Sequence, residues 1–513
     1  MTPRHKVASV PDGTPLASMP NRLKAVATIV FPPAVLTAIA LWAVYPLLEE
    51  WGMYRAFNAQ GLGYIWELAR QIPMRPFHLI PYAVHWISGG GNPAGVGIGT
   101  AIFLLMRYFV TYWAVTPFLK GNARLLAATL AATLLAWPGA WYGRYAAAQA
   151  SAILFFLALG FSVRFLRAPS WRSTAGCIVS VFLLLCTYQA LAICLLAIPL
   201  VATSWPAPPA VASGAVNSRL SNAGRTAIPI ASGFLLYAIY AVTCKLILGS
   251  LGYEESLASD ASRLLSVPGA VTHIKAVYAT AYFNTVYVFP LLLAFFLLVH
   301  RDGLRRTGEP GRALSSAAAA ILLVGALPLM SLVFVNEAHM RDLDRVLFPL
   351  SVGFVLVMAT ASFHLVGRGL EEIHPGTAAS AIGLLLIAAF LTAANGRENG
   401  LIQASVLKQT LPILSKTGPR SVLLRDETGK LGDVYTLYQI AFELALVVSG
   451  ADVKAMICTP RGVDRLHDVA RRFPIPSTPR CEELQDGGAG ELVLSARWEN
   501  GVIRIDEAAR RLP

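Results

Sequence analysis

The sequence predicts an all-α polytopic membrane protein of about eleven transmembrane helices, followed by a small C-terminal α/β domain. Two observations on composition support this: 55% of the 513 residues are hydrophobic and only 14% are charged, which does not suit a soluble domain of this length. The third is that apolar runs of about twenty residues recur, each long enough to cross roughly 30 Å of hydrocarbon. These runs are continuous rather than alternating, which indicates membrane-spanning helices.

The apolar runs place the spans at about 25–47, 96–119, 124–140, 146–163, 174–187, 190–205, 227–248, 282–299, 314–335, 346–365 and 376–394. The run 174–205 is too long for one crossing, so we divide it at the turn 187–189. The run 77–89 is too short, and we expect it to form a juxtamembrane or re-entrant helix on the outer side.

Basic residues set the expected orientation. If the N-terminal tail (1–24) is cytoplasmic, every inner connection is basic, as the positive-inside rule requires. The membrane domain (25–395) then has outer loops at 48–95, 249–281 and 336–345. The net charge of +13 follows largely from the inner loops. No block of like charges indicates nucleic-acid binding, and the expected surrounding is the lipid bilayer.

The composition changes after the last predicted span. Residues 396–513 are ordinary in charge and combine alternating stretches, "SVLLRD" and "ELVLSARWENGVIRID", with a helical "VYTLYQIAFELALVV". We therefore expect an α/β domain on the outer face. It contains Cys458 and Cys481, which an oxidising compartment would allow to pair, and the sequence leaves their bridging open. The other four cysteines lie in or beside spans and are expected to be packing residues.

Candidate chemistry gathers in the first outer loop. Glu49 and Glu50 follow the first span directly, and an amphipathic segment (61–72) suited to the membrane interface comes next. Arg75 and His78 then lie near membrane level. An arginine can bind a lipid-linked phosphate, while a carboxylate removes a proton from an incoming hydroxyl. Taken alone, however, the glutamate pair fits charges that flank a helix better than a catalytic role.

The arrangement resembles the GT-C membrane glycosyltransferases, and within them the O-antigen glucosyltransferase type. The resemblance covers roughly residues 20–395 and rests on short motifs: an acidic pair after the first span, an Arg-Pro before the second, and a Tyr-Gln at a middle outer turn. Here these are Glu49-Glu50, Arg75-Pro76 and Tyr188-Gln189. The chain departs from the family in having glutamates where aspartates are common, which shifts the carboxylate by about one bond.

The resemblance implies a GT-C-like fold in a bacterial inner membrane. It also implies an inverting enzyme that moves a sugar from a polyprenyl-phosphate donor to a cell-envelope glycan or lipid, such as lipopolysaccharide O-antigen. Adjacent helical residues do not face the same way, so only one glutamate is expected to act. We favour Glu50 as the general base, with Glu49 binding acceptor or serving structure. Arg75 would bind the donor phosphate, and His78 the substrate.

Further candidates each have two interpretations. Arg341, Arg345 and His339 either bind donor phosphate and substrate or form a self-neutralising loop. Arg144 either contacts phosphate or anchors the interface. Tyr188 and Gln189 either bind sugar or cap helices. Arg107, near the middle of a span, is either functional or paired within the bundle.

The sequence shows no Walker loop, metal-ligand spacing or dinucleotide loop. No cofactor or metal site is assigned, although a divalent cation stays open. Three alternatives remain for the function. One is an O-antigen-type polymerase or ligase, which would depend on outer-loop arginines and histidine. Another is a polytopic transporter or flippase for lipid-linked sugars, which would carry charges within its spans. The third is a non-catalytic assembly partner, which would transfer no sugar.

Overall fold

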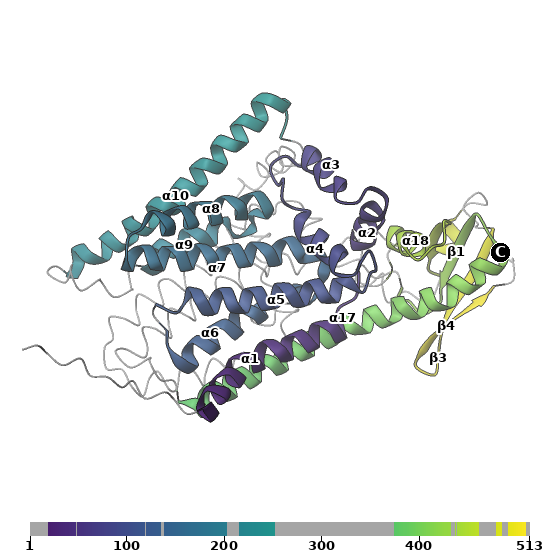
Figure 1. Ribbon diagram of the computed structural model, residues 1–513. Coiled ribbons are helices and arrows are strands. Elements are labelled where there is room, and N and C mark those ends of the chain that lie inside the picture. The colour runs from purple at the N-terminus through teal and green to yellow at the C-terminus, as the bar shows by residue number, and fades with distance from the viewer. Residues whose placement is uncertain are drawn as a thin grey trace, which may run out of the picture.

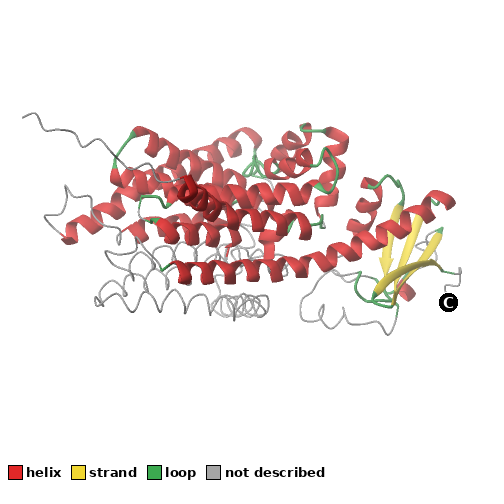
Figure 2. Cartoon of the chain, turned by 60° about the horizontal axis from the view of Figure 1, so that its bottom comes forward, coloured by secondary structure: helices red, strands yellow, loops and turns green. Residues whose placement is uncertain are grey.

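In the computed structural model, the described residues are 19–47, 49–117, 119–134, 138–202, 215–251, 374–431, 437, 439–460, 479–484 and 491–508. They form a mostly helical bundle with a small sheet at one end (Figures 1 and 2). The predicted spans at 282–299, 314–335 and 346–365 lie outside this part of the chain. So do residues 1–18, the loop 336–345 and most of the loop 249–281.

Each predicted span that falls on described residues contains a helix. These helices are α1 (Met19–Ala43), α5 (Gly95–Ala114), α6 (Gly121–Thr133), α7 (Ala146–Arg167), α8 (Trp171–Thr187), α9 (Ala192–Ala202), α10 (Ala215–Leu248) and α17 (Pro375–Thr417). Within the described part of the chain, five segments could cross a membrane by length and composition: Val26–Ala43, Gly95–Ala114, Gly143–Arg167, Asn222–Leu248 and Pro375–Thr417. The chain thus has several apolar helices suited to a multi-pass membrane protein.

The long run 174–205 is divided as predicted. Helix α8 ends at Thr187, Tyr188 is extended, and a short 3-10 turn, η4 (Gln189–Leu191), leads into α9. Helix α6 is shorter than predicted, because Leu134 adopts a left-handed conformation with φ 46° that ends the helix.

Buried Arg107 joins three helices. From α5 it donates to Oε1 of Gln149 on α7 at 3.2 Å and to the carbonyl of Ala132 at 2.8 Å. The second bond satisfies a carbonyl that the end of α6 leaves open. The structure therefore favours pairing within the bundle for this arginine.

Helices α1 and α17 lie side by side and run in the same direction (Figure 1). Trp42 stacks on Phe390 with ring centroids 5.2 Å apart, and its carbonyl accepts a hydrogen bond from Nε of Arg397 at 3.2 Å. Farther along both segments, Trp51 bonds to Gln403. The Met19 and Pro375 ends of the two helices therefore lie at the same end of the bundle.

Two arginines lie at the end of the bundle where α1 and α17 begin. Arg124, at the start of α6, donates to the carbonyl of Tyr112 at 2.7 Å, and Arg164 near the end of α7 donates to Trp113 at 2.8 Å. Both guanidinium groups also lie over the aromatic ring of the residue that they bond to. This end thus combines cations with aromatic rings, a pairing suited to a membrane interface.

The opposite end carries the polar segments. Three short helices, α2 (Glu49–Gln60), α3 (Gly63–Gln71) and α4 (Ile80–Ser88), fill most of the loop 48–95. The segments 61–72 and 77–89 were predicted to form short helices, and α3 and α4 confirm this. Helix α3 buries none of its residues, and Trp66 on it is 69% exposed.

The sheet lies beyond this end and has the strand order β2-β1-β3-β4. Its strands are β1 (Ser421–Asp426), β2 (Lys454–Cys458), β3 (Leu492–Glu499) and β4 (Val502–Glu507), with β1 parallel to β2 and β3, and β3–β4 a hairpin. Helix α18 (Gln439–Val448) packs on β2. The predicted α/β composition is confirmed. Helix α17, however, continues without a break through the boundary expected at 395/396.

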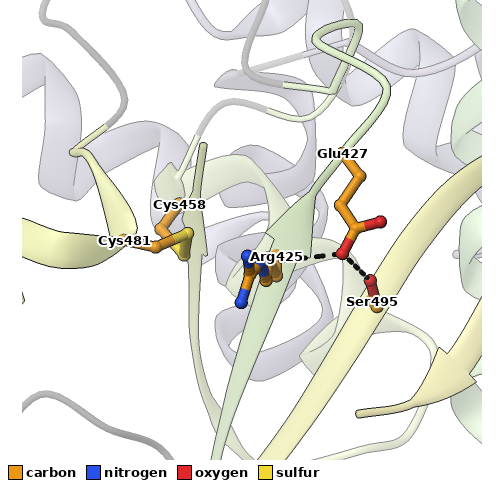
Figure 3. The surroundings of a disulfide bond; sticks show 5 residues. All are labelled: Arg425, Glu427, Cys458, Cys481 and Ser495. Atoms are coloured by element: carbon orange, nitrogen blue, oxygen red, sulfur yellow. Dashed lines mark hydrogen bonds and ion pairs between the residues drawn. A yellow bond between two sulfur atoms is a disulfide. The ribbon is translucent and has the colours of Figure 1, made fainter. Parts of the chain in front are cut away.

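A disulfide joins Cys458 at the end of β2 to Cys481 (Figure 3). Beside it, Arg425 lies opposite Cys458 in the strand register, and Glu427 accepts a hydrogen bond from Ser495 at 2.7 Å. The remaining four cysteines are free; three of them are buried, in keeping with a packing role.

Candidate active site

Glu50 is buried at the polar end of the bundle, only 1% exposed. It is the second residue of α2, and its Oε2 accepts the backbone N–H of Leu47 at 2.8 Å. That amide precedes the helix, where helix geometry leaves donors open, so the contact stabilises the start of α2. Glu49 is the first residue of α2, and which of the two acids acts stays a prediction.

The free oxygen of Glu50 faces a histidine that the sequence did not single out. Nδ1 of His85, on α4, lies 3.6 Å from Oε1 of Glu50, and each side chain is 1% exposed. The imidazole contacts the rings of Phe103 and Tyr82, with centroids 5.5 and 6.4 Å away. Two helices separated in sequence thus deliver a carboxylate and an imidazole to one enclosed position.

Two glycines make room for this pair. A Cβ added to Gly143, in the 3-10 turn η3 (Gly143–Tyr145), would overlap Oε1 of Glu50 and a methyl group of Val96. A Cβ added to Gly99, on α5, would overlap Cδ2 of His85. Both positions therefore need the close approach that only glycine permits.

The enclosed position changes the electrostatics of Glu50. Burial raises the pKa of its carboxyl, while His85, the Leu47 amide and Arg144 act in the opposite direction. Burial and the nearby charge of Glu50 also raise the pKa of Tyr54, one turn farther along α2. A carboxylate with a raised pKa is a stronger base than an exposed one, which suits proton abstraction.

A second group of predicted residues meets where the segment before α4 crosses the turn after α8. The Phe77 amide donates to the Cys186 carbonyl at 3.2 Å, and His78 Nδ1 lies 3.2 Å from the Thr187 carbonyl oxygen. These contacts bring Arg75 beside Tyr188, with Cζ 5.6 Å from the ring centre.

Gln189 also joins the segment before α4 to the turn after α8. Its Nε2 lies 3.4 Å from the Met74 carbonyl and also bonds to the hydroxyl of Tyr237 on α10, which donates to Met74 at 3.1 Å. The structure therefore brings Arg75, His78, Tyr188 and Gln189 together, as a shared site requires.

Tyr82 connects the two groups. Its ring centroid lies 5.7 Å from that of His78 and 6.4 Å from that of His85, and its hydroxyl donates to the Arg144 carbonyl. Arg144 is itself 4% exposed, and its guanidinium lies 5.1 Å from the Tyr145 ring centre. A continuous row of side chains runs from Arg75 through Tyr82 to Glu50.

Sequence reasoning missed His85, Tyr82 and Tyr54. One signal was available, because His78, Tyr82 and His85 are spaced by four and then three residues, the spacing of one helix face, although α4 itself begins only at Ile80. Arg341, Arg345 and His339 lie outside the described residues, so their place relative to this row stays a prediction. Within the described ranges no three His, Cys, Asp or Glu side chains gather as a metal site would require.

Comparison of the chain with protein-family models and with curated proteins found no match.

Proposed function

We propose that the chain is an inverting, membrane-embedded glycosyltransferase that uses a polyprenyl-phosphate sugar donor and a cell-envelope glycan or lipid acceptor. One observation carries the proposal: the buried carboxylate of Glu50 and the cation Arg75 lie at the two ends of one row of side chains, and Arg144 adjoins that row through its carbonyl and acts electrostatically on Glu50. A base and phosphate-binding groups at the edge of a bilayer are what this reaction needs.

In the proposed reaction Glu50 removes the proton of the acceptor hydroxyl as its oxygen attacks the anomeric carbon. The bond from that carbon to the donor phosphate breaks on the opposite face, which inverts the centre. Arg75 and Arg144 neutralise the charge that develops on the leaving phosphate, with Arg341 and Arg345 as further candidates. His78, Tyr188, Gln189 and His339 would hold the substrates.

The proposed placement is a bacterial inner membrane with the N-terminus in the cytoplasm. The end of the bundle that carries Arg124 and Arg164 suits the cytoplasmic face. The disulfide of the α/β domain suits the oxidising periplasm. Because α1 and α17 run the same way, an odd number of crossings separates them. Eleven spans in all, with α17 as the last, satisfy this condition.

The test is transfer by the full-length protein in lipid nanodiscs, with a panel of polyprenyl-phosphate sugars and radiolabelled product as the readout. We expect Glu50→Gln to lose about 10²- to 10⁴-fold of the rate, the usual contribution of a general base, and Glu49→Gln to lose less. Glu67→Gln, which removes an exposed acid on α3, is the matched control. Full transfer by both the Glu49 and Glu50 variants would refute the assignment.

A further inference from the structure

Several unpartnered polar atoms meet at Glu50. Among the described residues, Oε1 of Glu50 and both ring nitrogens of His85 have no hydrogen-bond partner, although both side chains are almost fully buried. A buried polar group left in this state loses its hydration without a compensating bond, so native structures rarely keep one without a functional reason. Nδ1 of His85 and Oε1 of Glu50 approach one another to 3.6 Å, which joins these unpartnered atoms to one another.

We propose that His85 is a positioning residue that directs an Nδ1–H at Oε1 of Glu50 and holds the carboxylate ionised and aimed for catalysis. The inference rests on the proposed function, because it gives Glu50 the role of base. It adds that Glu50 works only as half of a Glu50–His85 pair.

The two carboxylate oxygens differ in their partners. Oε2 accepts the Leu47 amide at 2.8 Å, whereas Oε1 faces His85 and has two lone pairs, one for the Nδ1–H of His85 and one for the proton of the substrate. The 3.6 Å separation exceeds a hydrogen bond by a few tenths of an ångström, and a small rotation of either side chain closes it. Such contacts often tighten only when substrate binds.

The surroundings hold both partners in place. Gly99 lets the imidazole lie against α5, Gly143 lets the carboxylate lie against η3, and Phe103 packs edge-on against the imidazole. Close packing on these sides leaves the pair little freedom except along the line that joins Nδ1 to Oε1. This is the arrangement expected of a supported site rather than of a surface ion pair.

Other ionisable groups on the packed elements do not replace His85. Besides Glu49, they are Tyr54 and Arg55 on α2, Tyr64, Glu67 and Arg70 on α3, Tyr82 on α4, Arg107, Tyr108 and Tyr112 on α5, Arg144 and Tyr145 in η3, Arg164 and Arg167 on α7, and Glu443 on α18. Of the cations in this set, Arg144 lowers the pKa of Glu50, and it does so less than His85. Glu443 accepts the Ala455 amide at 3.2 Å and so serves the sheet.

The first test needs no activity. Protein labelled with [¹⁵N]histidine in nanodiscs gives ring-nitrogen signals that report which nitrogen carries a proton, and His85→Asn identifies the His85 signals among the nine histidines. We expect Glu50→Gln to shift the His85 signals and Glu67→Gln to leave them in place. Unshifted signals in Glu50→Gln would overturn the inference.

The second test is the pH dependence of kcat/KM. Without His85 the carboxylate of Glu50 is harder to ionise. In His85→Phe, which keeps a ring of similar shape, the acid limb of the pH profile of kcat/KM should therefore move to higher pH. His85→Asn, which keeps a donor near the Nδ1 position, should restore the limb at least in part. A merely structural role would lower the rate and leave the limb unmoved.

Two glycines on α5 offer a variant and a matched control that leave the side chains of Glu50 and His85 unchanged. Gly99→Ala displaces His85, and we expect it to lower kcat/KM about 10²-fold, the usual cost of a misplacement of about 1 Å. Gly97→Ala meets only ordinary contacts, the nearest being 3.4 Å from the Ala40 carbonyl, and is expected to keep the rate. Equal rates in the two variants would count against the pair.

The two proposals can fail separately. A wild-type protein that transfers no sugar, while Glu50→Gln still shifts the His85 signals, would refute the glycosyltransferase and retain the coupled pair. Normal transfer with no coupling would refute only the role of His85.

Discussion

Trp51 donates its indole N–H to Oε1 of Gln403 on α17 at 3.1 Å, while Glu50, its neighbour in sequence, faces His85. Trp51 belongs to the core formed by α17, α18 and the sheet, whereas Tyr54 and Phe57 on the same helix belong to the core of the bundle. Helix α2 is therefore shared between the two cores, and the residue proposed as base lies on the shared helix.

Trp51→Phe should destabilise the protein. The substitution keeps an aromatic ring but leaves the buried Oε1 of Gln403 without its donor, which costs about 1–3 kcal/mol. Size-exclusion chromatography after heating measures the change. Trp66→Phe, on an exposed side chain, should shift stability by no more than about 0.5 kcal/mol. Equal shifts in the two variants would show that the bond contributes nothing.

Glu50→Gln should stabilise the protein at neutral pH while it removes transfer. Burial raises the pKa of Glu50 in the folded state, so the folded protein binds this proton more tightly than the unfolded chain does. The stability that this proton contributes is present below the ordinary carboxyl pKa and is lost as pH rises through the folded pKa. The uncharged glutamine avoids that loss.

The gain from Glu50→Gln is therefore expected to be larger at pH 7.5 than at pH 5, as measured by thermal unfolding at both values. If Glu50 served only to anchor α2, the substitution would instead lower stability at every pH.

Gly143→Ala should impair transfer about 10²-fold, because the new methyl group displaces the Glu50 carboxylate. The control is Gly383→Ala on α17, where an added Cβ meets no atom within 4 Å. Because alanine is the better helix former, the control should be neutral or slightly stabilising. Wild-type kcat in Gly143→Ala would mean that the observed position of the carboxylate is unimportant for the reaction.

Native protein, denatured without reductant, should show four free thiols out of six cysteines. Replacing both Cys458 and Cys481 by serine should cost about 2–4 kcal/mol, since the bridge closes a loop between residues 23 positions apart. Cys244→Ser, which removes a free thiol, is the control. Six free thiols in protein purified from its membrane would also remove the argument for an oxidising compartment.

The architecture was largely predictable because its signals are local. Apolar run length gave each described span, and alternation gave β1, β3 and β4 of the α/β domain, whereas the short β2 was not singled out. The end of α6 was not predictable, because the residue that takes the left-handed conformation there is Leu134. Glycine or asparagine, which usually take this conformation, would have indicated it. The continuity of α17 was also missed, since composition changes near residue 396 while helix propensity does not.

The site was predictable in part. Glu50, Arg75 and Tyr188 stood out because charged or paired polar residues are rare in this chain. His85 did not, since its role depends on the packing of α4 against α2 and on the absence of a side chain at Gly99. Contacts between distant segments leave no periodic mark in either segment, so only the folded structure reveals them.

The unbroken α17 has a mechanical consequence. Its 43 residues make a rod about 65 Å long at 1.5 Å per residue, about twice the thickness of the hydrocarbon layer. In the proposed placement, with the sheet outside the membrane, this rod would fix the height of the sheet above the lipid headgroups. A load on the sheet would then tilt the rod and reach the membrane segment directly, because α17 runs unbroken from the bundle to within a few residues of β1.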